Sequence, residues 1–385
     1  MDFELNEDQI AFADMAKAFA QNEMEPHAAE WDEKQIFPVE TLQKAGELGF
    51  CGLYSPEEAG GLGLSRLDSS IIFEQLAMGC TSTTAFITIH NMATWMIADF
   101  ANETTRDFWC PDLTSGQKLA SYCLTEPNAG SDAASLKTTA RRDGDNYVLN
   151  GSKIFISGAG STDVLVVMAR TGEDGPKGIS AFAVDAKLDG IVYGRKEDKM
   201  GWNSQPTRMI TFEDVVIPAS CLMGNEGDGF KIAMKGLDGG RINIATCSVG
   251  TAQAALNRAK EYMHERKQFG KELAQFQALQ FKLADMATEL VAARQMIRLA
   301  ASKLDANHPD KTTYCAMAKR FATDVCFNIC DEALQIFGGN GYIKEYPMER
   351  YVRDNRVHRI LEGTNEIMRV IVARRLLLED AADIL

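Results

Sequence analysis

"DNYVLNGSKIFISG", residues 145–158, is the stretch that decides the fold, because it begins a β-rich region in a chain whose two flanks have the hydrophobic period of helices. Apolar and β-branched residues dominate it, and Asn150-Gly151 is a pair typical of a type I′ turn. The stretch therefore predicts two short strands joined at Asn150-Gly151.

Further β-rich runs follow this stretch, with Gly, Pro and Asp between them and no helical pattern. They read "TDVLVVMAR" (162–170), "GISAFAVD" (178–185), "GIVYGR" (190–195) and "TRMITFEDVVIP" (207–218). Consecutive short strands without helices between them predict an antiparallel barrel or sandwich, not a doubly wound parallel sheet.

Both flanks of this β region have helical patterns. On the N-terminal side the loop "PEEAGGLGLS" (56–65) is predicted to be a plain loop, since its glycines lack the spacing of a phosphate-binding motif. On the C-terminal side two apolar seams predict a helical bundle. The N-terminal helix is marked by Leu5, Ile10, Phe12, Met15 and Phe19, and the seams by Leu279, Leu283, Met286, Leu290, Ala293, Ile297, Ala300 and Leu304, then by Tyr314, Met317, Phe321, Val325 and Ile329.

The sequence thus predicts an α+β multidomain fold, and 385 residues are enough for two or three domains. The expected parts are an N-terminal α-helical domain (1–119), a middle antiparallel β-barrel or sandwich domain (120–229) and a C-terminal four-helix bundle (230–385).

Composition excludes several function classes. The formal net charge of −14 argues against a nucleic-acid surface. Nine scattered Cys without a CxxC pair fit buried thiols better than disulfides, and although Cys326 and Cys330 could share a helix face, no His completes a metal set. The acidic start is unlike a targeting peptide, and no apolar run reaches the ~18 residues of a membrane span. We expect a cytoplasmic protein without a metal, a nucleic-acid partner or a membrane anchor.

Motifs of common catalysts are missing as well. The chain contains no GxGxxG after a strand, no GxxxxGK[ST], no HExxH and no GxSxG. Its five His residues are too dispersed to form a cluster. Metal-dependent and serine hydrolysis are therefore poorly supported.

Five short segments have an unusual composition: "SYCLTEPNAGSDAASL" (121–136), "KIFISG" (153–158), "HERKQFG" (264–270), "QIFGGNGY" (335–342) and "HRILEGTNEIMR" (358–369). Each alone has an ordinary explanation. The first is common loop material and the fourth could be a glycine-rich helix end. Without further context, Glu366 could be a helix N-terminal acid and Arg241 a surface cation.

Together, the order and spacing of these segments resemble the acyl-CoA dehydrogenase family across essentially the whole chain. "GCTSTTAFITIHNMATWMI" (79–97) and "GWNSQPTR" (201–208) resemble most the members that act on isobutyryl-CoA. One departure is Asn128, which stands where the family usually has Gly. Because Asn tolerates a left-handed backbone best after Gly, this exchange puts little in doubt.

The resemblance implies a non-covalent FAD between the β domain and the C-terminal bundle. Cofactor contacts within one subunit would come from Tyr122, Leu124, Thr125, Gly130, Ser131, Phe155, Ser157, Thr364 and Glu366. Contacts to the FAD of a neighbouring subunit, in a homotetramer, would come from Arg266, Phe269, Phe276, Gln277, Gln335, Gly338 and Gly339. The acyl-CoA substrate would be held by Ser131, Asp238, Arg241 and Gly363.

The resemblance also implies a catalytic role for Glu362 of "EGT". Desaturating a thioester requires a base for the α-proton while hydride leaves the β-carbon, and a carboxylate shielded from water suits that task. Gly363 would allow substrate and backbone to approach closely. Some family members carry the base near the position of Gly240, where this chain has glycine, so Glu362 has no rival.

The expected reaction is the conversion of isobutyryl-CoA to methacrylyl-CoA in valine breakdown, with electrons passed to an electron-transferring flavoprotein. A 2-methylbutyryl-CoA or other short-chain dehydrogenase is the nearest alternative. An acyl-CoA oxidase would be longer by a helical domain, and a non-catalytic scaffold of the same fold would not need Glu362 and Arg241. The resemblance fits a bacterial cytosol or a processed form in the mitochondrial matrix.

Overall fold

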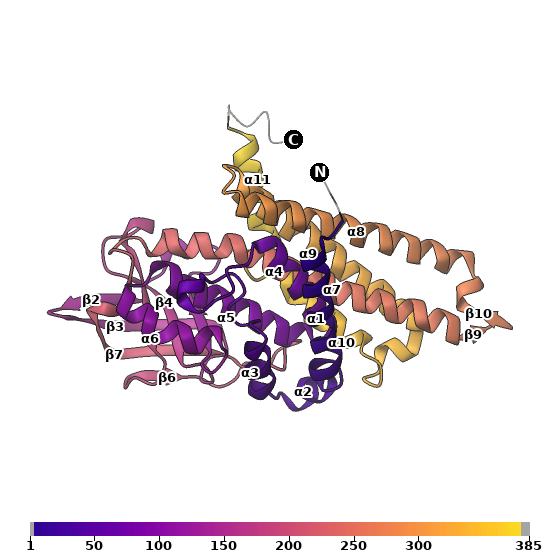
Figure 1. Cartoon of the computed structure of the whole chain (residues 1–385), viewed down its shortest axis with the longest axis horizontal. Coiled ribbons are helices and arrows are strands. Elements are labelled where there is room, and N and C mark those ends of the chain that lie inside the picture. Colours follow the sequence, from indigo (N-terminus) through magenta and orange to yellow (C-terminus); the bar gives the residue numbers. More distant parts are fainter. Residues whose placement is uncertain (1–3, 379–385) are drawn as a thin grey trace.

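A computed structural model of the chain describes residues 4–378. Its parts follow the sequence in order (Figure 1): N-terminal helices, a β-sheet at one end of the molecule, and long helices that run to the opposite end. Among the described residues, no helix is both long and apolar enough to cross a membrane.

The N-terminal part is helical, as predicted. Its helices begin at polar caps: the side chain of Asn6 accepts from the backbone N–H of Gln9 in a reciprocal capping box, and the side chains of Ser65 and Asn102 each accept from a backbone N–H three residues later at the start of another helix. The loop at 56–65 contains one short 3₁₀ turn, Glu57–Ala59. The α-helices are α1 (Glu7–Phe19), α2 (Ala28–Lys34), α3 (Val39–Glu47), α4 (Arg66–Gly79), α5 (Thr81–Phe100) and α6 (Glu103–Thr114), and a π-helical turn, Ala20–Met24, extends α1.

The middle part is one eight-stranded sheet with the order β6-β7-β3-β2-β4-β5-β8, and β1 pairs with β4 outside this path. Most pairs are antiparallel, but β1 and β2 each run parallel to β4, so the prediction of a wholly antiparallel domain was wrong on this point. The strands are β1 (Ala120–Cys123), β2 (Thr139–Asp143), β3 (Asn146–Ser157), β4 (Val164–Arg170), β5 (Ile179–Asp185), β6 (Ile191–Tyr193), β7 (Thr207–Pro218) and β8 (Leu222–Met223).

The sheet curves around its own apolar core. Tyr147 on β3 and Phe182 on β5 have ring centroids 5.0 Å apart, although two strands lie between β3 and β5 in the sheet. In a flat sheet these strands would be roughly 14 Å apart. The other face of β4 and β5 packs against α5, which places the N-terminal helices over the start of the β region.

The prediction of a hairpin turn at Asn150-Gly151 was wrong. β3 runs unbroken through both residues, and the pairing with β7 shifts register between Leu149 and Gly151. Gly151 has φ +140°, and a Cβ there would lie 2.6 Å from Thr138 Oγ1, so this glycine serves an irregularity within the strand. The real turn joins β2 to β3 at Gly144, whose φ is +59°.

The C-terminal part is dominated by three long helices, α7 (Gly229–Glu265), α8 (Gln277–Asp305) and α9 (Lys311–Phe337). The seam predicted on α8 is confirmed, because Met286, Leu290 and Ile297 are buried in the helical core. The shorter elements are the hairpin β9 (Lys267–Gln268) and β10 (Lys271–Glu272), the 3₁₀ turns Leu273–Gln275, Gly338–Tyr342 and Val357–Arg359, and the helices α10 (Met348–Arg356) and α11 (Asn365–Leu376).

The seam predicted on α9 was only partly right. Ile329 is buried in the core as predicted, whereas Tyr314, Phe321 and Val325 only flank it, and a buried line of small residues runs along α9. Small side chains let helix axes approach closely, which explains why α9 can lie against both α7 and α8. The buried line is Cys315, Ala318, Ala322, Cys326, Cys330 and Ala333.

Candidate functional site

Glu362 lies in the loop between the 3₁₀ turn Val357–Arg359 and α11. Its backbone is left-handed with φ 56°, and Gly363 follows with φ 89°. A non-glycine residue in this region stores strain of order 1 kcal/mol, which folded proteins retain mainly at functional sites. Thr364 then caps α11, its hydroxyl accepting from the backbone N–H of Ile367 at 3.3 Å. This sharp turn allows the carboxylate to point into the protein instead of along the helix.

The carboxylate of Glu362 rests against a glycine of α7. Its Oε2 atom is buried and has no hydrogen-bond partner. A Cβ placed on Gly240 would lie 2.4 Å from that oxygen, a distance that real Cβ atoms essentially never show. Only glycine at position 240 therefore leaves room for Glu362.

Burial governs the electrostatics of this carboxylate. It raises the pKa of Glu362 to about 7, while the nearby Arg241 and Lys319 hold the pKa down to a smaller extent. Tyr122 lies close enough that Glu362 helps to raise the pKa of its phenol, after burial, and the phenol oxygen is itself buried without a partner. The site therefore contains two buried polar atoms without hydrogen-bond partners, an arrangement typical of functional sites.

Asp238 and Arg241 are joined to each other. Arg241 Nη1 donates to Asp238 Oδ1 at 2.7 Å, and the hydroxyl of Thr312 donates to Asp238 Oδ2 at 2.7 Å. Both charged residues are buried, so Arg241 is not the surface cation that it could have been. Arg241 Nε is buried without a partner. No described contact links this pair to Ser131, which lies on an exposed turn.

The segments 122–131 and 153–157 lie side by side, as the predicted cofactor site requires. The backbone N–H of Ile154 donates to the carbonyl of Thr125 at 2.9 Å, and the hydroxyl of Ser121 donates to the carbonyl of Ser157 at 2.7 Å. Asn128 is not among the residues with positive φ, so the exchange from glycine requires no unusual backbone there.

A buried ion pair, which the sequence analysis did not predict, fixes these two segments together. Lys153 Nζ donates to Glu126 Oε1 at 2.7 Å and to the carbonyl of Leu124 at 3.0 Å. Glu126 in turn accepts from the backbone N–H groups of Lys137 and Thr138. Such a satisfied network is rigid, which suits a surface that must fit a planar ligand.

The surface that these segments present is open and aromatic. Phe155 is 64% exposed and has a left-handed backbone, φ 59°, at a register shift between β3 and β7. Because of this bulge, the alternation of strand faces does not by itself put Phe155 and Ser157 on the same side. A Cβ on Gly130 would meet nothing within 4 Å. An exposed ring beside open backbone fits the flat ring system of a flavin.

The second group of predicted cofactor residues lies at the opposite end of the molecule, around the β9–β10 hairpin (Figure 1). Phe269 is 94% exposed there, and its ring faces Phe276. Tyr262, near the end of α7, contacts the segment that follows α9. Its ring stacks on that of Phe337 with the centroids 4.0 Å apart, and its hydroxyl accepts from Asn340 Nδ2 at 2.8 Å. These contacts place the end of α7 beside residues 337–340. The predicted residues of this group are Arg266, Phe269, Phe276, Gln277, Gln335, Gly338 and Gly339.

Thr364 and Glu366 differ in their surroundings. The Thr364 hydroxyl is engaged as the cap of α11, whereas the Glu366 side chain is 81% exposed, 4.0 Å from Arg369. Among the described residues, no cluster of three or more His, Cys, Asp or Glu side chains could hold a metal ion. All nine cysteines are free, and Cys326 and Cys330 are both buried in the helical core.

A loop of the β domain connects to the Glu362 region through buried polar contacts that the sequence did not reveal. Trp202 Nε1 donates to His358 Nε2 at 3.2 Å, and the other ring nitrogen of His358 lies 2.7 Å from Ser248 Oγ. The backbone N–H of Trp202 also donates to Asp354 at 2.6 Å, and burial raises the pKa of Asp354 to about 6. The only sequence signal was the unusual "GWNSQPTR" itself.

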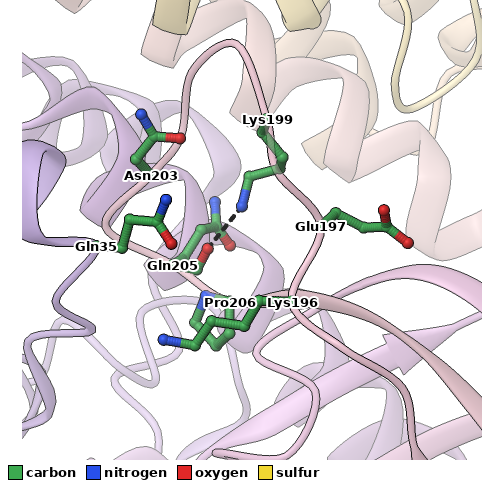
Figure 2. A pocket seen from close by; sticks show the side chains of 7 residues that line it. All are labelled: Gln35, Lys196, Glu197, Lys199, Asn203, Gln205 and Pro206. Carbon is green, nitrogen blue, oxygen red and sulfur yellow. Dashed lines mark hydrogen bonds between the residues drawn. The ribbon is translucent and has the colours of Figure 1, made fainter.

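Figure 2 shows a small polar pocket at the base of this loop, where Lys199 Nζ donates to the carbonyl of Gln205 at 2.8 Å. None of the predicted site residues lines it. Its lining consists of Gln35, Lys196, Glu197, Lys199, Asn203, Gln205 and Pro206.

Comparisons with known proteins agree with this architecture. Sequence models of the acyl-CoA dehydrogenase N-terminal, middle and C-terminal domains match residues 6–117, 121–215 and 227–377. The mitochondrial isobutyryl-CoA dehydrogenase of Bos taurus is 56% identical over 375 residues, which cover 97% of this chain and 90% of that protein.

Solved structures give the same result. The butyryl-CoA dehydrogenase of Megasphaera elsdenii superposes with a TM-score of 0.95 at 40% identity, covering 98% of this chain and all of that one. PigA, solved with FAD and proline, has a TM-score of 0.94 at 30% identity and covers 98% of this chain and 99% of its own. The chain belongs to the acyl-CoA dehydrogenase family of oxidoreductases, with its three domains in the family order.

Proposed function

We propose that this acyl-CoA dehydrogenase converts isobutyryl-CoA to methacrylyl-CoA in valine breakdown, with Glu362 as the catalytic base. The observation that carries the proposal is the Oε2 atom of Glu362, buried and unpartnered against Gly240. A buried carboxylate without donors destabilises a fold, so its retention favours a role in chemistry. The identity to the bovine isobutyryl-CoA dehydrogenase supports the choice of substrate.

The pKa of about 7 suits Glu362 to general-base work. A base is most effective when its pKa lies near the working pH, because it is then both ionised in a useful fraction and strong enough to take the proton. Glu362 Oε2 would accept the proton from the α-carbon. Arg241 and Lys319 keep part of the population ionised at neutral pH.

Of the residues that we assign to acyl-CoA, Asp238, Arg241 and Gly363 are near this base in the chain or on the helix that Glu362 contacts. Asp238 and Arg241 lie on α7 within one turn of Gly240, and Arg241 Nε is a buried donor free to bind the ligand. Gly363 follows the base directly, and Ser131 would contact the ligand from the exposed turn of the β domain. Arg241 supplies the local positive charge that an anionic ligand needs on a chain with a net charge of −14.

The cofactor that we propose is FAD, as in the family. We assign the flavin ring to the exposed ring of Phe155 and the neighbouring segment with Tyr122, Leu124 and Thr125, which the Lys153–Glu126 pair joins to the strand of Phe155. A bound flavin supplies the acceptor for the hydride that leaves the β-carbon. The chain's own residues exclude water and hold the proton at Glu362.

A second copy of the chain would complete the cofactor site. The β9–β10 hairpin lies at the end of the molecule opposite the β-sheet and exposes the aromatic side chain of Phe269, so its residues suit the FAD of a neighbour better than their own. We therefore propose a homotetramer. We further propose an electron-transferring flavoprotein as the acceptor of electrons, in a bacterial cytosol or the mitochondrial matrix.

One experiment tests the reaction. Anaerobic addition of isobutyryl-CoA to the flavin-loaded wild-type protein should bleach the flavin absorbance. Glu362→Gln keeps the shape of the side chain but removes the base, so bleaching should slow by at least the ~10²–10⁴ typical of losing a general base. Acyl-CoA binding should persist, because Asp238 and Arg241 are untouched.

Glu366→Gln is the matched control, since it makes the same change four residues away on the exposed side of α11. It should weaken FAD retention, and added FAD should restore most of the rate. Fast bleaching by Glu362→Gln would show that the base lies elsewhere, and a wild-type protein that does not bleach would refute the proposed function.

A further inference from the structure

Lys319 is a buried lysine that the reaction as described does not use. Its side chain is 0% exposed, on the face of α9 that otherwise carries small residues. Lysine is almost never fully buried unless its charge is paired, and burial of an unpaired ammonium costs several kcal/mol. The position therefore calls for an explanation beyond helix packing.

The ammonium group of Lys319 is directed at the backbone of the Glu362 loop. Nζ donates to the carbonyl of Gly363 at 2.7 Å and to Asn365 Oδ1 at 2.9 Å. Asn365 is oriented in turn, because its Nδ2 donates to Thr323 Oγ1 and to Asp324 Oδ1, each at 2.9 Å. This network fixes the residue directly after the candidate base and the first residue of α11.

Such an anchor matches the unusual backbone of the loop. Glu362 and Gly363 are both left-handed, a conformation that a loop keeps only when its surroundings hold it. The Gly363 carbonyl would be left without this donor if Lys319 were replaced by an apolar residue. This hydrogen bond is partly buried, so an acceptor left without its donor would cost up to ~1–3 kcal/mol and weaken the turn.

Lys319 and Glu362 also influence each other electrostatically. Burial lowers the pKa of Lys319 to about 7 and Glu362 pulls it upward, while Lys319 contributes to lowering the pKa of Glu362. A positive charge near the loop favours the ionised carboxylate. The other titratable or charged groups that face this pair are Arg241 on α7, Asp324 on α9, Glu366 on α11, His358 in the turn Val357–Arg359, Tyr54, and Tyr122 on β1.

We propose that Lys319 is a positioning residue for the catalytic step: it holds the Glu362–Gly363 turn through the Gly363 carbonyl and presents its charge to the Glu362 carboxylate. The inference rests on the proposed role of Glu362 as the base. No atom of Lys319 is required to touch the substrate or the cofactor.

Three substitutions separate the hydrogen bonds from the charge. Lys319→Gln keeps a donor and removes the charge, Lys319→Met removes both, and Lys319→Arg keeps both in a bulkier form. Lys282→Gln is the matched control, since Lys282 forms a half-exposed ion pair with Glu332 outside the Glu362 site.

The first readout is the pH dependence of kcat/KM. Without the cation the carboxylate is harder to ionise, so the acidic limb of Lys319→Gln should move to higher pH by about one unit, the effect of losing an opposite charge at close range. Lys319→Arg and Lys282→Gln should keep the wild-type limb. An unshifted limb in a folded, flavin-loaded Lys319→Gln variant would overturn the charge role.

The second readout needs no activity. Amide hydrogen exchange of peptides covering residues 361–368 should be at least tenfold faster in Lys319→Met than in wild type, and close to wild type in Lys319→Gln. Equal exchange in all variants would overturn the anchoring role. If Lys319→Met does not fold, the pH profiles of Lys319→Gln and Lys319→Arg still test the charge role. A wild-type protein inactive on isobutyryl-CoA would refute the proposed function, whereas the exchange result would stand independently.

Discussion

Gly240→Ala tests the geometry of the candidate base most directly. The new Cβ would lie 2.4 Å from Glu362 Oε2, 3.0 Å from Glu362 Cδ and 3.2 Å from Met92 Sδ. Gly240 is inside α7 with helical backbone, so the helix itself favours alanine by ~1 kcal/mol. The substitution should therefore displace the Glu362 carboxylate without destabilising the helix.

The size of the effect follows from the contact distance. An ordinary contact begins at 3.4 Å, so Glu362 Oε2 must retreat by about 1 Å. A displacement of ~1 Å in a catalytic group can cost ~10²-fold in rate. We expect the rate of flavin reduction by isobutyryl-CoA to fall by about 10², while the melting temperature stays within a few degrees of wild type because the helix gain offsets part of the strain.

The assay is anaerobic stopped-flow reduction of the flavin, with flavin content measured in each sample. Gly239→Ala is the control, because its Cβ would also find an atom at 2.4 Å, but that atom is Nη1 of Arg66 and not an atom of the candidate base. This variant should lose much less than Gly240→Ala. If both variants reduce flavin within about threefold of each other, the assignment of Glu362 as a base packed on Gly240 is wrong.

Three further outcomes are expected. The pKa of Glu362 is raised from 4.5 to about 7 on folding, so the native state binds the proton more tightly and wild-type stability falls as pH rises from 4.5 to 7. Glu362→Gln should therefore be more stable than wild type at pH 8, by at most about 3 kcal/mol, and equal to it near pH 4.5; a pH-independent difference in melting temperature would contradict this. Arg266→Ala should lower the FAD content and the melting temperature of the oligomer, since bound ligand stabilises the native state. Full flavin content with an unchanged melting temperature would count against the proposal that the β9–β10 hairpin contacts the cofactor of a neighbour. Ranked by kcat/KM, isobutyryl-CoA and 2-methylbutyryl-CoA should exceed isovaleryl-CoA and octanoyl-CoA, and octanoyl-CoA as the best substrate would refute the proposed substrate class but not the reaction.

Sequence patterns predicted the helical, β and helical parts because each has its own hydrophobic period. They failed where a single residue pair had two physical explanations. Asn150-Gly151 suits a type I′ turn, but a glycine is equally needed where a strand bulges past a neighbouring side chain such as Thr138. Local sequence cannot distinguish the two, since the neighbour is 13 positions away in the chain.

The candidate site was predictable to a similar degree. Family resemblance pointed to Glu362, and the structure places it buried against Gly240. Lys319 and the Lys153–Glu126 pair were not foreseen, because a lysine in a helix or strand normally faces solvent and nothing in the sequence marks these as buried. On α9, the prediction relied on large apolar residues, whereas most of the residues buried against the neighbouring helices are Ala and Cys.

Because α7 is continuous, mutations at its two ends should affect different subunits of an assembly. The helix runs without a break from Asp238 and Gly240 to the residue before Arg266, and 25 residues at ~1.5 Å each separate Arg241 from Arg266 by about 37 Å. When a second copy completes the cofactor site, as we propose, damage at the tip of one chain falls on its neighbour, whereas damage to Glu362 falls on the chain that carries it. Co-expressed chains with one defect each should rebuild some intact sites in mixed assemblies. Two alleles that both lack Glu362 could never do so. A host with one allele defective at the β9–β10 hairpin and one defective at Glu362 would retain part of the activity.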